Sequence, residues 1–91
     1  MKEKRVRITF YGRVQGVGFR YRAYHIARAL GITGYVRNNY DGTVEVELQG
    51  SSEAIDTFYG MINNQRYIDI EYMDIRDMEP VSDERGFGIR D

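Results

Sequence analysis

Residues 4–30 read KRVRITFYGRVQGVGFRYRAYHIARAL, and the hydrophobic period changes within this stretch. Apolar and polar side chains alternate over residues 4–12, which predicts a half-buried strand. Residues 12–19 hold three glycines in eight positions, so we expect no regular structure there. Apolar side chains then recur at helical spacing over residues 20–30, and Gly31 is a natural stop. The stretch therefore predicts a strand, a glycine-rich loop and a helix in direct succession.

The rest of the chain continues with alternating strands and one more helix. Asn39-Tyr40-Asp41-Gly42 is a hairpin signal, and Ser51 or Ser52 can cap a second helix that extends to about Asn63. The apolar phase shifts after Tyr72, which predicts a bulge near that residue. The expected strands cover residues 32–39, 43–49 and 67–76, followed by a polar loop over 77–84 and a short last strand that contains Phe87 and Ile89. On the third of the five expected strands, we expect Glu45, Glu47 and Gln49 to face outward.

This order of elements is βαββαβ with a short extra strand at the end. Right-handed connections then give an α+β fold, a ferredoxin-like βαββαβ sandwich. We expect a four-stranded antiparallel sheet with two helices on one face. Residues 1–91 are expected to form a single domain. Since this fold hosts many functions, it does not identify one.

Composition narrows the class of protein. The chain is 42% hydrophobic and 30% charged, which is typical of a globular domain. It contains no cysteine, so disulfides, iron–sulfur clusters and thiolate chemistry are excluded. No apolar run approaches the length of a membrane span, and the charged N-terminus does not resemble a signal peptide. We therefore expect a cytoplasmic protein that does not bind a membrane.

Charge is unevenly distributed along the chain. Residues 1–40 hold nine Lys/Arg and one acidic residue, whereas residues 41–91 hold four Lys/Arg and thirteen Asp/Glu. One interpretation is that oppositely charged faces pair within the fold. The other is that the N-terminal part builds an anion site.

The glycine-rich loop and the arginine that follows it favour an anion site. Glycines let consecutive backbone N–H groups converge on one point, and the helix start near Arg20 adds a partial positive charge. The guanidinium of Arg20 matches phosphate oxygens bidentately. The alternative is a tight strand–helix connection with a surface arginine. The loop is not a Walker A motif, and it lacks the third glycine of a dinucleotide fingerprint.

Asn38, which ends the second expected strand, is a second candidate site residue. Its side-chain amide carries both a donor and an acceptor, so it can hold a water molecule in one orientation while remaining uncharged. The alternative is an ordinary asparagine before a turn.

Two longer motifs make the chain resemble a known family. Residues 12–20 resemble the first signature of the acylphosphatase family, G-x-V-Q-G-V-x-F-R. Residues 34–50 resemble its second signature, which requires Asn38. Position 35 holds Tyr where Trp is more common, and here we expect only a change in packing.

The resemblance implies a hydrolase that cleaves the carboxyl–phosphate bond of acyl phosphates by in-line attack of water. It implies that Arg20 and Asn38 are the catalytic residues. It also implies a phosphate-binding loop that we expect to comprise Gln15, Gly16, Val17, Gly18, Phe19 and Arg20. We expect no metal and no cofactor, a small acyl phosphate as substrate, no nucleic-acid partner and a monomer.

Two other functions compete with this one. A domain of the same family could hold an acyl phosphate for a partner, as in larger carbamoyl-transfer proteins. A ferredoxin-like RNA-binding domain would need exposed sheet aromatics in an RNP pattern, which the sequence lacks.

Overall fold

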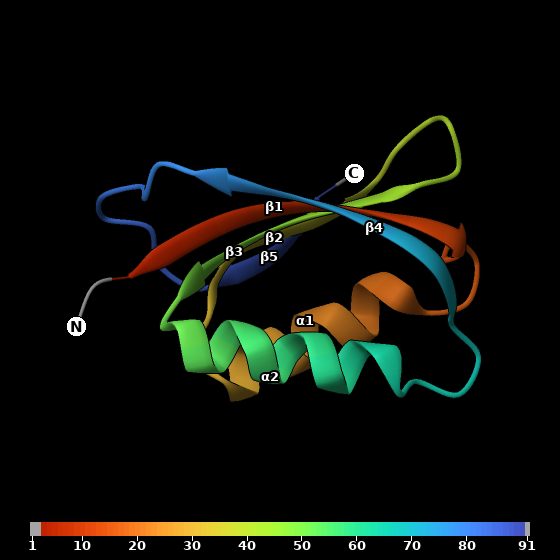
Figure 1. Ribbon diagram of the computed structural model, residues 1–91, viewed down its shortest axis with the longest axis horizontal. Helices are drawn as coiled ribbons and strands as arrows, with labels where there is room; N and C mark the ends of the chain where they lie inside the picture. Colours follow the sequence, from red (N-terminus) through yellow and green to blue (C-terminus); the bar gives the residue numbers. More distant parts are fainter. Residues whose placement is uncertain (1–2, 91) are drawn as a thin grey trace.

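The computed structural model describes residues 3–90 and consists of a twisted sheet covered on one face by two helices (Figure 1). Its elements, in chain order, are β1 (Lys4–Arg13), α1 (Phe19–Ala29), β2 (Thr33–Asn38), β3 (Val44–Gly50), α2 (Ser52–Asn63), β4 (Asp69–Met78) and β5 (Phe87–Arg90). The side chain of Ser51 accepts a hydrogen bond from the N–H of Ala54, so the predicted cap of the second helix is confirmed.

The sheet has five strands in the order β4-β1-β3-β2-β5. The expected four-stranded antiparallel sheet is therefore wrong in strand number and direction, while the ferredoxin-like class is confirmed. β5 pairs with β2 in parallel, with Val36 opposite Ile89, whereas the other neighbouring strands are antiparallel. Phe87 is buried and anchors β5 on the sheet. Because β5 lies beside β2, the C-terminal strand borders the end of the sheet where Asn38 lies.

The hydrophobic core lies between the sheet and the two helices, which cover the same face (Figure 1). Alternate residues of β1 and β3 point into this layer because successive side chains of a strand face opposite sides. The helices add one apolar stripe each. The largest fully buried side chains are Phe10, Phe19, Phe58, Ile8, Ile32, Leu48, Ile55, Ile62, Val6, Val14, Val36 and Val44. Phe19 and Val14 fix both sides of the glycine-rich loop to this core.

β1 extends to Arg13, so the first two residues of the expected loop belong to a strand. Tyr11 pairs with Tyr72 and Gly12 with Ile70, which leaves Glu71 as the extra residue of a bulge. The predicted bulge near Tyr72 is confirmed. Gly12 has a φ of +123°, and a Cβ there would lie 2.3 Å from the carbonyl oxygen of Asp69. The bulge therefore requires glycine at this position and directs the chain into the loop.

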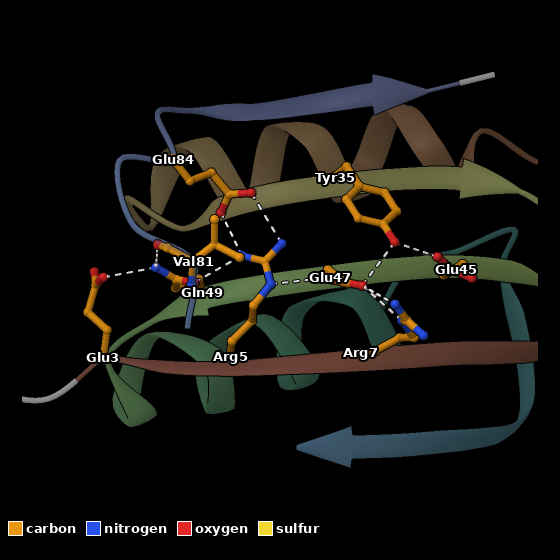
Figure 2. Close-up of polar contacts among 9 residues, drawn as sticks. All are labelled: Glu3, Arg5, Arg7, Tyr35, Glu45, Glu47, Gln49, Val81 and Glu84. Atoms are coloured by element: carbon orange, nitrogen blue, oxygen red, sulfur yellow. Dashed lines mark hydrogen bonds and ion pairs between the residues drawn. The ribbon is translucent and has the colours of Figure 1, made fainter. Parts of the chain in front are cut away.

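The other sheet face carries a polar network (Figure 2). Arg5 is 4% exposed and donates to Glu47, Gln49 and Glu84. Arg7 also donates to Glu47. Pairing between the basic and acidic halves is thus confirmed for these residues. Glu47 and Gln49 lie on the face away from the helices, as expected, but both are buried. The side chains of Arg5, Arg7 and Tyr35 enclose Glu47. The loop before β5 covers Gln49, whose side chain exchanges two hydrogen bonds with the backbone of Val81.

This network determines the ionisation of its members. Burial opposes the charged form of Glu47, but hydrogen bonds from Arg5, Arg7 and Tyr35 outweigh it and lower the pKa of the carboxyl. Burial raises the pKa of Tyr35, and its contacts with Glu45 and Glu47 raise it further. The hydroxyl of Tyr35 donates to both carboxylates, so this residue contributes more than the expected packing.

Candidate active site

The loop between β1 and α1 has a glycine-dependent backbone. Gly16 has a φ of +73° and Gly18 a φ of +81°, both in the left-handed region that favours glycine. A Cβ at either position would meet no atom within 4 Å, so conformation and not space requires glycine there. Within residues 3–90, the amide N–H groups of residues 15–19 donate no hydrogen bond. These amides are therefore free to bind an anion.

Arg20 lies in the first turn of α1, directly after the loop. The first helical hydrogen bond runs from the N–H of Arg22 to the carbonyl of Gly18, so the preceding amides also point outward from the helix start. The side chain of Arg20 is half-buried. Its guanidinium forms no ion pair with an acidic residue in the described part of the chain, which leaves its positive charge available for a ligand.

Asn38 is the last residue of β2 and has an unusual side-chain environment. Its Oδ1 atom is buried and has no hydrogen-bond partner among residues 3–90. A buried acceptor left without a partner costs free energy. A water molecule or ligand group that donates to this oxygen would remove the penalty.

One pocket of about 430 Å³ brings these residues together. Its lining consists of Val14, Gly16, Gly18, Phe19, Arg20, Tyr21, Asn38 and Ile89. Arg20 and Asn38, which are 18 positions apart in the sequence, thus border the same cavity. Val17 lines a neighbouring cavity instead, and the side chain of Gln15 points elsewhere.

Gln15 connects the loop to the β2–β3 turn. Its Nε2 atom donates to the carbonyl oxygen of Asn39 at 2.7 Å and to that of Thr43 at 2.9 Å. The turn is itself closed by a backbone bond from Asn39 N–H to the Thr43 carbonyl. The hydroxyl and N–H of Thr43 donate to Asp41, which lowers the pKa of that carboxyl. Gln15 therefore holds the loop against the segment that follows Asn38.

Sequence reasoning missed Val14, Tyr21 and Ile89 as pocket residues. Tyr21 follows Arg20 directly, but only its position on the exposed side of α1 brings it to the cavity. Ile89 reaches the cavity because β5 pairs with β2. The alternation of Phe87 and Ile89 indicated a strand, but no local signal indicated its neighbour in the sheet.

The fold and the pocket define a small ferredoxin-like domain in which a glycine-rich loop, an arginine and an asparagine meet at one cavity. The family model described as Acylphosphatase matches residues 6–89. The chain belongs to the acylphosphatase family. An acylphosphatase from Geobacillus kaustophilus is 44% identical over 87 residues, which cover 94% of this chain and 93% of that one. One from Bifidobacterium longum is 44% identical over 89 residues, or 94% of this chain and 91% of that one.

Solved structures share the fold. The crystal structure of acylphosphatase from Bacillus subtilis matches with a TM-score of 0.89 at 30% identity, over 96% of this chain and 98% of that one. Full-length HypF in its phosphate- and nucleotide-bound form also matches with a TM-score of 0.89, at 29% identity. That match covers 99% of this chain but only 12% of HypF. The same fold therefore occurs both as a short chain and within a longer one.

Residues 3–90 lack two features, a membrane-spanning helix and a cluster of metal-binding side chains. No helix there has the length and apolar character to cross a membrane. No group of three or more His, Cys, Asp or Glu side chains in this range is arranged to hold a metal ion.

Proposed function

We propose that this protein is an acylphosphatase, which hydrolyses the carboxyl–phosphate bond of acyl phosphates to a carboxylate and inorganic phosphate. Membership of the acylphosphatase family supports this activity. The observation that carries the site assignment is the shared pocket of Arg20, Asn38 and the glycine-rich loop.

The loop and Arg20 bind the phosphoryl group. The amides of residues 15–19 carry no internal hydrogen bond within the described chain and supply preorganised donors for the phosphoryl oxygens. Arg20 adds a planar pair of donors and a full positive charge. Phosphoryl transfer depends mostly on positioning and charge stabilisation, so these groups act most strongly where negative charge accumulates in the transition state.

Asn38 holds the attacking water. Its buried Oδ1 has no partner among the described residues and can accept a hydrogen bond from that water, which directs an oxygen lone pair towards phosphorus. The water oxygen forms a bond to phosphorus as the bond from phosphorus to the carboxyl oxygen breaks. The electron pair of that bond leaves with the carboxylate, and the proton of the water passes to a phosphoryl oxygen. A carboxylate is a weak base, so its departure requires no general acid.

Steady-state hydrolysis of benzoyl phosphate by the purified protein tests the proposal. We expect Arg20→Ala and Asn38→Ala each to lower kcat by about 10²–10³-fold, the range for loss of a preorganised donor. Arg20→Lys should be nearly as harmful because the planar fork is lost. Arg22→Ala is the matched control, since Arg22 is an exposed arginine of the same helix that does not line the pocket. Normal turnover by a folded Arg20→Ala or Asn38→Ala variant would reject the assignment.

The domain organisation, oligomeric state and location of the protein are also proposed here. We propose a single domain over residues 1–91 that acts as a monomer in the cytoplasm without metal, cofactor or nucleic acid. Hydrolysis with a chelator present and without any partner protein separates this function from a domain that only holds an acyl phosphate. Light scattering of the purified protein measures its oligomeric state.

A further inference from the structure

Two exposed apolar side chains in the pocket lining have no role in phosphate binding or water positioning. Tyr21 and Ile89 line the same cavity as Arg20 and Asn38, yet they are 60% and 45% exposed. Both present exposed apolar surface to the cavity that Arg20 and Asn38 also line. Isolated exposed apolar residues are common, but these two come from separate elements, α1 and β5, and meet at one cavity.

The ring of Tyr21 is held in place by its neighbours on α1. His25, one helical turn further on, packs against it edge-to-face with ring centroids 4.3 Å apart. Tyr24 also packs edge-to-face against His25, with ring centroids 5.2 Å apart, and the hydroxyl of Tyr24 accepts a hydrogen bond from Arg28. This row of contacts restricts the Tyr21 ring before any ligand arrives, which lowers the entropy cost of binding against it.

Ile89 is fixed by the backbone of the sheet. It pairs with Val36, which lies two residues before Asn38 on the neighbouring strand β2. Since alternate residues of a strand share a face, Ile89, Val36 and Asn38 lie on the helix-facing side of the sheet. The side chain of Ile89 therefore stands beside the proposed water-binding residue.

We propose that Tyr21 and Ile89 bind the acyl group of the substrate and make the enzyme prefer acyl phosphates with a bulky apolar acyl group, such as an aromatic ring, over short ones. This inference rests on the proposed function. The phosphoryl group occupies the loop and Arg20, so the carbon skeleton joined to it extends towards the opening of the cavity. The groups that it meets there are an aromatic face and a branched aliphatic side chain, which favour apolar partners.

Kinetics with two substrates test the proposal. Benzoyl phosphate and acetyl phosphate share the phosphoryl end and differ in the acyl group, and intrinsic reactivity cancels when their kcat/KM ratio is compared between variants. We expect Tyr21→Ala and Ile89→Ala each to lower the benzoyl-to-acetyl ratio by about three- to tenfold, the value of one aromatic contact. The loss should appear in the KM for benzoyl phosphate, because the contact exists before and during the reaction. Tyr21→Phe should retain the ratio.

Two controls separate this role from a structural one. Tyr67→Ala removes a tyrosine that is 72% exposed and lies outside the pocket, so the ratio should not change. The inhibition constant of inorganic phosphate should stay the same in all variants, because the phosphate site is untouched. Equal losses for both substrates, or an unchanged ratio in Tyr21→Ala and Ile89→Ala, would overturn the proposal.

A binding measurement tests the acyl site independently of the proposed hydrolytic activity. If the protein hydrolysed neither substrate, the function would fail, but calorimetry with two non-hydrolysable phosphonates would still test the acyl site. Phenacylphosphonate should bind more tightly than acetonylphosphonate, and Tyr21→Ala should remove most of the difference. Equal affinities of the two phosphonates for the unmodified protein would refute the acyl site on their own.

Discussion

Gln15 connects the two halves of the proposed site, and its removal tests whether that connection matters. Gln15→Ala deletes two hydrogen bonds, of 2.7 Å to the Asn39 carbonyl and 2.9 Å to the Thr43 carbonyl. The backbone N–H of residue 15 survives, so the proposed phosphate-binding amides remain. The variant therefore separates the support of the loop from the loop itself.

The expected loss of stability follows from the two contacts. A hydrogen bond contributes a net 0.5–1.5 kcal/mol, so two give about 1–3 kcal/mol. Because both bonds are partly buried, we expect the free energy of unfolding to fall by a value near the middle of this range, about 2 kcal/mol. Once the loop is free to move relative to Asn38, the phosphoryl group and the water are no longer held in line. Misplacement by about 1 Å costs up to roughly 100-fold in rate, so we expect kcat to fall between ten- and 100-fold.

Urea unfolding and benzoyl phosphate kinetics measure the two effects on the same preparation. The matched control is Gln65→Ala, which deletes one exposed side-chain bond to the Met61 carbonyl at the end of α2 and should change neither quantity measurably. Gln15→Glu should be worse than Gln15→Ala, because a carboxylate would face two carbonyl oxygens and add negative charge beside the phosphate. A Gln15→Ala variant that loses stability but keeps full kcat would refute the connection between the loop and Asn38.

Three further predictions concern the loop and the sheet. Gly18→Ala should lower stability by about 1–2 kcal/mol, since alanine must adopt the left-handed conformation, and should weaken inhibition by inorganic phosphate; unchanged inhibition would contradict the amide site. Gly34→Ala should prevent folding, as judged by circular dichroism, because a Cβ there would lie 1.9 Å from the carbonyl oxygen of Glu47. Ion pairing lowers the pKa of Glu84, and of Glu47 despite its burial. The two carboxylates therefore contribute their full stabilisation of the fold above the unfolded-state pKa of about 4.3. This contribution is lost as the pH falls through their lower pKa values in the folded state. The urea midpoint should therefore drop steeply below about pH 4, and less steeply in Glu84→Gln; equal slopes would refute this origin.

The polar network explains why the C-terminal segment stays on the sheet. Arg5 of β1 reaches Glu84 in the loop before β5 at 2.7 Å, and Arg90 of β5 lies 4.1 Å above the Tyr35 ring. Removing one partner of a buried ion pair typically costs about 3–5 kcal/mol. The network thus supports β5, which in turn brings Ile89 to the pocket.

The local features of this protein followed from its sequence. The change in hydrophobic period over residues 4–30 predicts the strand, loop and helix. The glycines at positions 16 and 18 indicate a backbone conformation that only glycine adopts readily. Arg20 is a candidate because it follows the glycine-rich loop at the start of a predicted helix, and Asn38 because its amide ends a predicted strand. These predictions succeed because helix spacing, strand alternation and positive φ are properties of residues close together in the chain.

Only the tertiary structure decided which distant residues meet. It added β5 to the sheet parallel to β2, buried Gln49 beneath the loop before β5, and turned the Gln15 side chain towards the β2–β3 turn. It also brought Tyr21 and Ile89 to the pocket of Arg20. The physical reason is that strand order and loop coverage depend on long-range packing and charge pairing, which leave no periodic trace in the sequence of the segments involved.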